Sequence, residues 1–184
     1  MGYVGFATLF LVGFMAFSLG SILVAVYSTL GRIWRMRRRI TKKLKGSGIR
    51  LSRLKEDSDI VPQIVMRFSG KVPGGRVARV EGRIGIIGDR EYLYATFYYA
   101  ADSSLPEFEV LVSSGGGVFV APSEVESSIR RELIESGEVR EVLKEARLQY
   151  LRHRPERRSM DISANTIDLG AVLRLVDSIL MRWD

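Results

Sequence analysis

Residues 2–30, GYVGFATLFLVGFMAFSLGSILVAVYSTL, contain no Asp, Glu, Lys or Arg, and this stretch decides how the rest of the chain is organised. At about 1.5 Å per residue, a helix of this length would be roughly 43 Å long, which exceeds the ~30 Å of hydrocarbon in a bilayer. A buried helix of a soluble protein rarely needs that length. The N-terminal residues before it also lack the positive charge of a signal peptide. We therefore expect residues 1–31 to form an uncleaved transmembrane anchor.

The positive charge of the protein is concentrated directly after this stretch. Residues 32–55 contain eleven of the 28 Lys and Arg and no acid, so the rest of the chain holds 17 basic and all 21 acidic residues. The net charge of +7 therefore comes from one segment, and it does not indicate a nucleic-acid binder. Basic residues that flank a span are retained in the cytosol. We expect a single-pass protein of the cell membrane, with its N-terminus outside and its C-terminal domain cytosolic.

The apolar stretch has two other interpretations, which are an anchor with its domain outside the cell and a cleaved signal peptide. A domain outside the cell, as part of a surface appendage, would break the positive-inside rule by eleven charges. A signal peptide would want a shorter apolar core followed by a cleavage site.

The basic segment is predicted to extend the span as an amphipathic helix, because Ile33, Met36, Ile40 and Leu44 recur every three or four residues. Its cations either only determine topology or also contact anionic lipid headgroups. The candidate membrane-surface residues are Arg32, Arg35, Arg37, Arg38, Arg39, Lys42 and Lys43. Residues 49–59 are interpreted as a linker, so that residues 32–57 form a basic juxtamembrane helix and linker.

Within the span, two pairs of small residues have the spacing that lets helices approach closely in a membrane. These pairs are Ala16 with Gly20, and Ser21 with Ala25. They predict a contact with a partner membrane protein or with a second copy of this chain. The alternative is that small residues are simply common in spans.

Residues 58–184 are expected to form one α+β domain, with a mainly antiparallel sheet packed against C-terminal helices. Alternation of apolar and polar residues predicts strands at 60–68, 78–86 and 107–112. A further short strand is predicted at 118–121. Residues 92–99 are apolar on both faces, as expected for a central strand. We expect Arg79 and Arg83 to pair across strands with Glu107 and Glu109. A fragment from about Ser58 onward should then fold by itself.

Helical patterns follow the strands. Ser123, with Glu126 three residues later, predicts a capped helix that stops near Gly137, and a second helix is expected from Glu138 with Val139 and Val142 inward. Residues 148–163 fit either an extension of that helix or a hairpin around Pro155, and the hairpin is preferred. Asn165 is expected to cap a last helix that packs on the sheet.

The sequence shows no arrangement that defines a catalytic centre. The chain has no Cys, no metal-binding motif and no phosphate-binding loop, so no cofactor or metal is predicted. His153 is the only histidine, and the arginines around it should lower its pKa. The cluster itself is a candidate contact for an anion or an acidic partner. It consists of Arg152, Arg154, Arg157 and Arg158.

These observations favour a non-enzymatic accessory, assembly or scaffold part of a membrane complex. The alternative from another class is a membrane-tethered hydrolase with a site at the loops around Asp102 and residues 115–117. One Asn and two Gln in the whole chain are typical of a thermophilic prokaryote. The sequence does not identify the partner.

Overall fold

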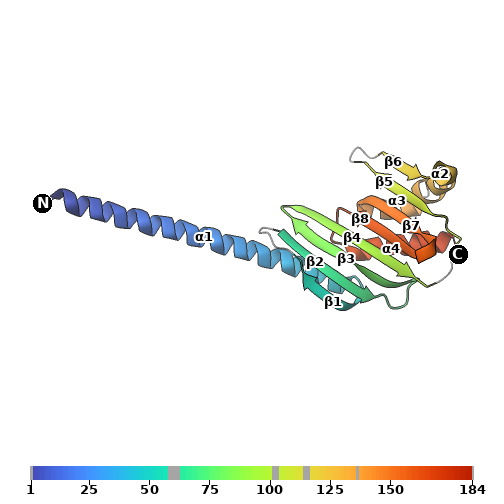
Figure 1. The fold of residues 1–184 in the computed structure, drawn as a ribbon, viewed down its shortest axis with the longest axis horizontal. Coiled ribbons are helices and arrows are strands. Elements are labelled where there is room, and N and C mark those ends of the chain that lie inside the picture. The colour runs from blue at the N-terminus through green and yellow to red at the C-terminus, as the bar shows by residue number, and fades with distance from the viewer. Residues whose placement is uncertain (1, 58–62, 101–103, 114–116, 136, 184) are drawn as a thin grey trace.

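The computed structural model describes residues 2–57, 63–100, 104–113, 117–135 and 137–183, with only the backbone described for residues 2–9, 134, 137–139 and 142. Helix α1 (Gly2–Gly46) is a continuous rod that projects far from the rest of the molecule (Figure 1). Its first part has exposed apolar side chains, whereas its last three turns lie against the domain. Ile40 and Leu44 are 0% exposed there.

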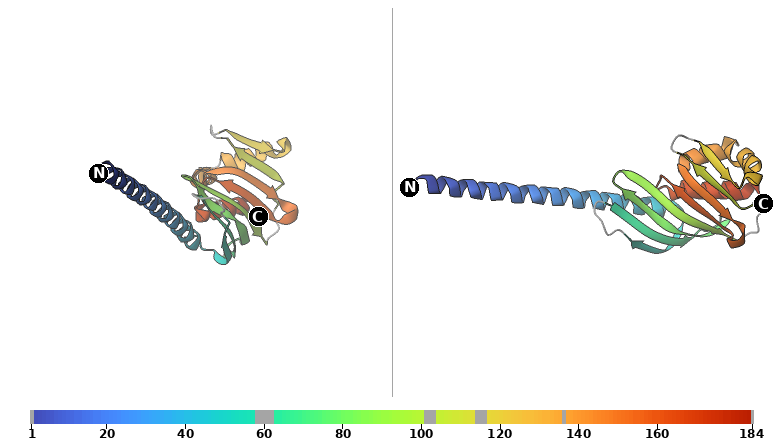
Figure 2. Two further views of the ribbon diagram at one scale, coloured as in Figure 1. Left: turned by 60° about the vertical axis from the view of Figure 1, so that its left-hand side comes forward. Right: turned by 45° about the horizontal axis from the view of Figure 1, so that its top comes forward.

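The domain is built on one sheet in which every pair of neighbouring strands is antiparallel. Its order is β1-β2-β3-β4-β8-β7-β5-β6, so β4 is central and β1 and β6 are the edges (Figures 1 and 2). The strands are β1 (Arg50–Glu56), β2 (Gln63–Lys71), β3 (Val77–Ile87), β4 (Arg90–Tyr99), β5 (Phe108–Val112), β6 (Val118–Ala121), β7 (Leu148–Arg154) and β8 (Ser159–Ala164). This architecture confirms the α+β class.

Helices cover only one face of the sheet. The last turns of α1 pack against α4 (Leu169–Arg182), β2 and β3, and α4 in turn packs against α3 (Gly137–Ala146). In β4, Leu93, Ala95 and Phe97 point into this core and are fully buried, while Tyr94 points the other way and is 47% exposed. The prediction that residues 92–99 form a central strand is confirmed, but their second apolar face meets solvent rather than another layer.

The structure settles the alternatives left open for the C-terminal third. Residues 148–163 form the hairpin β7–β8, joined by the short 3-10 helix η2 (Pro155–Arg157). Helix α2 (Ser123–Ile129) starts where predicted and continues into the π-helical segment η1 (Arg130–Ile134). The side chains of Val139 and Val142 lie outside the described part.

Two predicted helix caps are wrong. Pro122 occupies the N-cap of α2, and no described side chain caps that helix. The N-cap of α4 is Asp168 rather than Asn165, because the Asp168 carboxylate accepts a hydrogen bond from the Ala171 backbone N–H at 3.1 Å. Ser123 lies one residue after the N-cap of α2, and Asn165 lies three residues before the N-cap of α4.

The linker predicted over residues 49–59 is also wrong, because β1 occupies most of it and pairs with β2. Nearly all side chains of this edge strand are exposed, so it lacks the alternation that reveals a half-buried strand. The expected pairing of Arg79 and Arg83 with Glu107 and Glu109 does not form, since β4, β8 and β7 separate β3 from β5.

Candidate functional site

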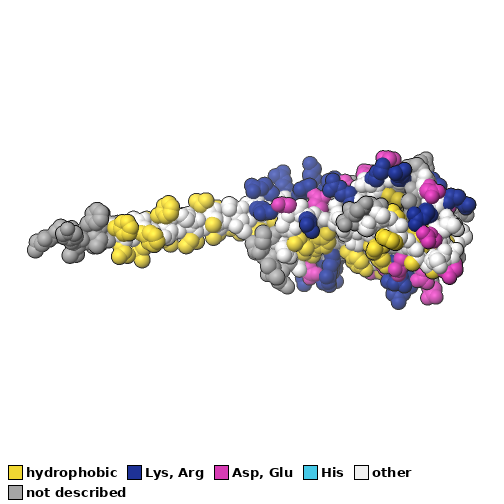
Figure 3. Space-filling view, turned by 90° about the horizontal axis from the view of Figure 1, so that it is seen from above, with side chains coloured by type: hydrophobic (Ala, Val, Ile, Leu, Met, Phe, Trp, Pro, Cys, Tyr) yellow, Lys and Arg dark blue, Asp and Glu magenta, His cyan; other side chains and the backbone are white. Residues whose placement is uncertain are grey.

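The N-terminal part of α1 is an apolar rod that projects away from the domain. The helix from Phe10 to Gly46 is long and apolar enough to cross a membrane, and its apolar window is 0% buried. Figure 3 shows hydrophobic side chains along this rod and Lys and Arg side chains where it meets the domain. Such a helix is consistent with a membrane anchor or a signal sequence.

The two pairs of small residues in α1 do not form one stripe. In a regular α-helix, which turns by about 100° per residue, Ala16 and Gly20 lie about 40° apart, and Ser21 and Ala25 lie on a face about 140° away from them. Space around Gly20 is open, because a methyl group added to it would have no described neighbour within 4 Å. One straight partner helix could therefore use one pair but not both.

Four of the seven candidate membrane-surface cations form ion pairs with the domain. Arg32 pairs with Asp89 at 2.8 Å, and Lys43 pairs with Asp168 at 2.5 Å. The other two pairs are Arg37 with Glu56 and Arg39 with Glu91. The acidic partners come from β1, β4, the β3–β4 turn and the start of α4, so these cations join α1 to four separate parts of the domain.

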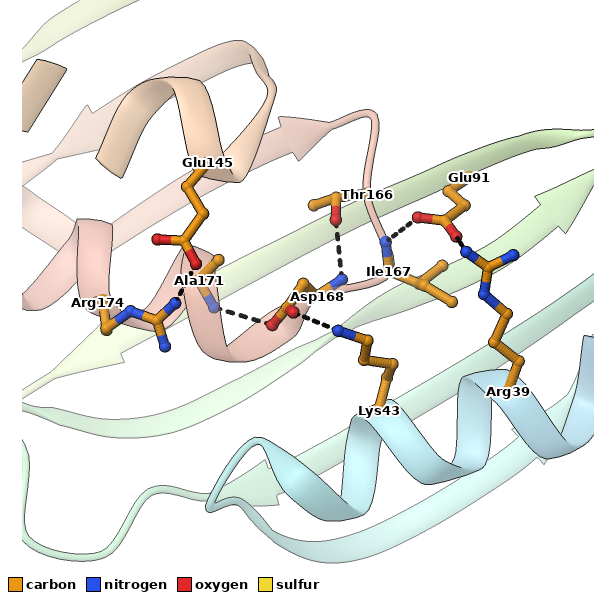
Figure 4. A network of polar contacts seen from close by, with 9 residues as sticks. All are labelled: Arg39, Lys43, Glu91, Glu145, Thr166, Ile167, Asp168, Ala171 and Arg174. Carbon is orange, nitrogen blue, oxygen red and sulfur yellow. Dashed lines mark hydrogen bonds and ion pairs between the residues drawn. The ribbon is translucent and has the colours of Figure 1, made fainter. Parts of the chain in front are cut away.

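Asp168 is central to this junction (Figure 4). One carboxylate oxygen caps α4 through Ala171, and the other accepts from the Lys43 ammonium. The hydrogen bond from Lys43 is the main reason that the pKa of Asp168 lies below its usual value, and burial opposes it. Charge on Asp168 therefore stabilises both the helix end and the attachment of α1.

Glu91 makes a second link between α1 and the turn that leads into α4 (Figure 4). One of its oxygens pairs with Arg39, and the other accepts from the Ile167 backbone N–H at 3.3 Å. A hollow of about 650 Å³ lies beside these contacts. Its charged lining consists of Arg39, Lys43, Arg90 and Arg147 together with Asp89, Glu91, Glu145 and Asp168, and this balance favours neither anions nor cations.

The other three candidate cations, Arg35, Arg38 and Lys42, are exposed. By helical geometry they share the side of α1 opposite the core-facing Ile40 and Leu44. The guanidinium of Arg38 lies over the Trp34 ring at 5.3 Å. Of the seven candidates, these three are the ones that form no ion pair with a residue whose side chain is described.

Two of the four arginines around the β7–β8 hairpin form ion pairs with described acids. Arg152 contacts Glu107 at 3.2 Å and Glu109 at 3.1 Å, and Arg154 contacts the buried Asp161 at 3.0 Å. Arg152, Arg154 and Arg157 line a common hollow of about 410 Å³. Arg158 is not in that lining, and its guanidinium donates to the Ala100 carbonyl at 3.4 Å. The hollow therefore offers an anion less positive charge than the sequence suggested.

His153 belongs to the core. It is 0% exposed, between the rings of Tyr99 and Phe108. Its Nδ1 donates to the Pro106 carbonyl at 2.6 Å, which leaves Nε2 to accept from the Tyr99 hydroxyl. Its pKa is lowered as expected, but burial is the cause, because the neighbouring arginines on β7 point to the opposite face of the sheet.

The open face of the sheet is the surface that the sequence analysis missed. Tyrosines and arginines gather on it, and a hollow of about 360 Å³ there is lined in part by Arg67, Arg83 and Tyr94. Tyr98 donates to Glu81 at 2.6 Å, which is the main reason that its pKa is raised. The signal lies in β4, where every second residue from Tyr92 to Tyr98 is a Tyr or Thr. A tyrosine counts as apolar in such a pattern even where, like Tyr94, it faces solvent.

The loops suggested for a hydrolase site are those around Asp102 and residues 115–117. Of these, Asp102 and residues 115–116 lie outside the described residues, and the Gly117 N–H donates to the Ser113 hydroxyl at 3.0 Å. In the part that is described, no group of three or more His, Asp or Glu side chains is arranged to hold a metal ion. Comparison with protein-family models, with curated proteins and with solved structures gives no match. Function must therefore be inferred from the residues of this chain alone.

Proposed function

We propose that this protein is a non-enzymatic, single-pass component of a membrane complex, and that α1 holds its cytosolic α+β domain at a fixed height and orientation relative to the bilayer. The observation that carries this proposal is the continuity of α1. The same helix that is apolar and exposed at its start contributes Ile40 and Leu44 to the domain core. A domain that only needed tethering would not require its anchor to be part of its core.

Two surfaces are suited to partners in such a complex. In the membrane, either pair of small residues of α1 allows close approach of a partner helix or of a second copy. In the cytosol, the open sheet face carries exposed tyrosine and arginine, the residues that are enriched in protein interfaces. Arg35, Arg38 and Lys42 would add contacts to anionic headgroups.

A helical insertion series tests the proposal. Two alanines inserted between Leu30 and Gly31 should rotate the domain by about 200° relative to the span, whereas four should rotate it by only about 40°. We expect native electrophoresis of detergent-solubilised cell membranes to show a complex that contains the wild-type protein. This complex should be lost with two inserted alanines and retained with four. Equal assembly by both variants, or a wild-type chain that migrates only as a monomer, would contradict the proposal.

The orientation is tested separately by cysteine labelling, because the natural chain contains no Cys. The variant Arg157→Cys carries one exposed thiol far from α1. A membrane-impermeant maleimide should label it only after cells are lysed. Labelling of intact cells would instead place the domain outside.

A further inference from the structure

A hollow of about 670 Å³ lies between α3 and the strands β5, β6 and β7. Its volume falls within the range of about 300–1,000 Å³ that is usual for small-molecule sites. Five apolar side chains form its walls, and four charged residues surround them. The apolar residues are Val110, Val112, Val118, Leu143 and Leu148, and the charged residues are Glu135, Arg140, Lys144 and Arg147.

The charged residues give the hollow a positive rim. Arg140, Lys144 and Arg147 follow one another at spacings of four and three residues, which places them on the same side of α3 and its last turn. Lys144 pairs with Glu141 at 3.2 Å. The guanidinium groups of Arg140 and Arg147 form no ion pair with any residue whose side chain is described. Among the described residues, Glu135 is the only acid in the lining.

The backbone fixes the position of Arg147. Its φ of 49° lies in the left-handed region, where glycine is the usual residue after a helix. Its N–H donates to the Lys144 carbonyl at 3.1 Å, and its carbonyl accepts from the Asn165 N–H at 3.0 Å. A position that favours glycine thus carries a cationic side chain, and Arg147 lines this hollow as well as the hollow beside Asp168.

We propose that this hollow binds one long-chain fatty acid, with the hydrocarbon chain against the valine and leucine walls and the carboxylate at Arg140 and Arg147. Arginine binds carboxylates through paired hydrogen bonds. Of the three rim cations, Lys144 is already paired with Glu141, which leaves Arg140 and Arg147 for the ligand. No described residue of α1 lines the hollow, so its ligand must leave the bilayer. A lipid with one chain does this readily, since a single acyl chain gives only marginal, reversible membrane binding. The choice of a lipid as ligand rests on the membrane anchoring in the proposed function, whereas the hollow and its cations do not.

The test uses the full chain in lipid nanodiscs and palmitate labelled with ¹³C at its carboxyl group. Wild type should give a bound carboxylate resonance that empty nanodiscs do not give. The double variant Arg140→Gln/Arg147→Gln should weaken binding at least about tenfold, because it removes the charge-assisted hydrogen bonds. The matched control Arg50→Gln, which changes an exposed arginine of the edge strand β1, should bind as wild type does.

Two further measurements distinguish the contribution of the hydrocarbon chain from that of the carboxylate. Methyl palmitate and butyrate should each compete poorly, because one lacks the carboxylate and the other the chain. Leu143→Phe, which narrows the hollow, should weaken binding in a protein with an unchanged melting temperature. The proposal is overturned by a missing bound resonance, by equal binding to the double variant, or by displacement of palmitate when anionic phospholipid is added to the discs.

Discussion

At the scale of single residues, Asp168 links the start of α4 to α1. Replacing it by Ala removes both the helix cap and the contact with Lys43. Loss of a cap costs about 1 kcal/mol, so we expect Asp168→Ala to lower the free energy of unfolding by at least about that amount. Denaturant unfolding of the full chain in detergent, followed by tryptophan fluorescence, measures the difference.

Asp168→Asn serves as the matched control for that prediction. Its amide oxygen can still accept from Ala171, but the charge that pairs with Lys43 is gone. This variant should keep most of the stability at pH 7 and lose the contribution that the lowered pKa of Asp168 makes. That contribution is present above the unfolded pKa near 3.8 and disappears as the pH falls through the folded pKa. An Asn variant as unstable as the Ala variant would show that the ion pair, not the cap, is what matters.

The buried His153 predicts a second dependence on pH. Burial lowers its pKa below 6.5, so the unfolded chain binds a proton in a range where the folded protein does not. Stability from the neutral imidazole is therefore complete above about pH 6.5 and falls as the pH drops below it. We expect the melting temperature to decrease from pH 7.5 to pH 5.5 by more in wild type than in His153→Asn.

The comparison concerns the slope and not the absolute stability. We expect His153→Asn to be less stable than wild type at every pH, because the Tyr99 hydroxyl loses the His153 Nε2 as its acceptor. Every other titratable group is common to both proteins, so its effect cancels in the comparison. Identical slopes would contradict the prediction, because they would mean that His153 has the same pKa in the folded and unfolded states.

At the scale of elements, the packing of α1 and β1 leads us to expect a folding unit larger than residues 58–184. A fragment of residues 58–184 lacks β1 and the last turns of α1, and with them Ile40 and Leu44. Each fully buried Leu or Ile contributes about 1.5–3 kcal/mol, so this fragment should be unfolded or aggregate. A fragment of residues 32–184 keeps these parts and should melt cooperatively in circular dichroism. Equal stability of the two fragments would contradict the packing of α1.

The sequence predicted the elements whose patterns are strong. The strands with alternating burial, the hairpin at Pro155 and the last helix all occur near their expected positions. Strand β1 was missed because an exposed edge strand has no apolar alternation. The apolar stripe of α1 after residue 32 was identified correctly, but an amphipathic face does not say whether it packs on lipid or on protein.

The candidate sites were harder to predict than the fold. Sequence spacing revealed the cations of residues 32–43, but not that four of them have acidic partners between 19 and 125 residues away. Arg152 and Arg154 seemed to surround His153, although strand geometry directs them to the other face. The hollow under α3 combines residues of three strands and one helix, and only the tertiary fold brings them together.

At the scale of the whole molecule, the protein is a long helical rod joined end-on to a one-layer sheet backed by helices (Figures 1 and 2). The joint has an apolar part, Ile40 and Leu44, and a polar part, four ion pairs that surround it. Exposed ion pairs alone contribute little, so the apolar part should dominate the strength of the joint. The apolar contacts and the ion pairs together should hold α1 rigidly relative to the sheet.

The most direct test of this central claim is a distance distribution between spin labels on the rod and on the sheet. Labels at Tyr27→Cys and Tyr94→Cys occupy exposed positions in a chain with no other Cys. In nanodiscs, pulsed electron paramagnetic resonance should give one narrow distribution, and four glycines inserted after Gly31 should broaden it. A broad distribution in the uninterrupted chain would contradict the account, because α1 would then be a flexible tether.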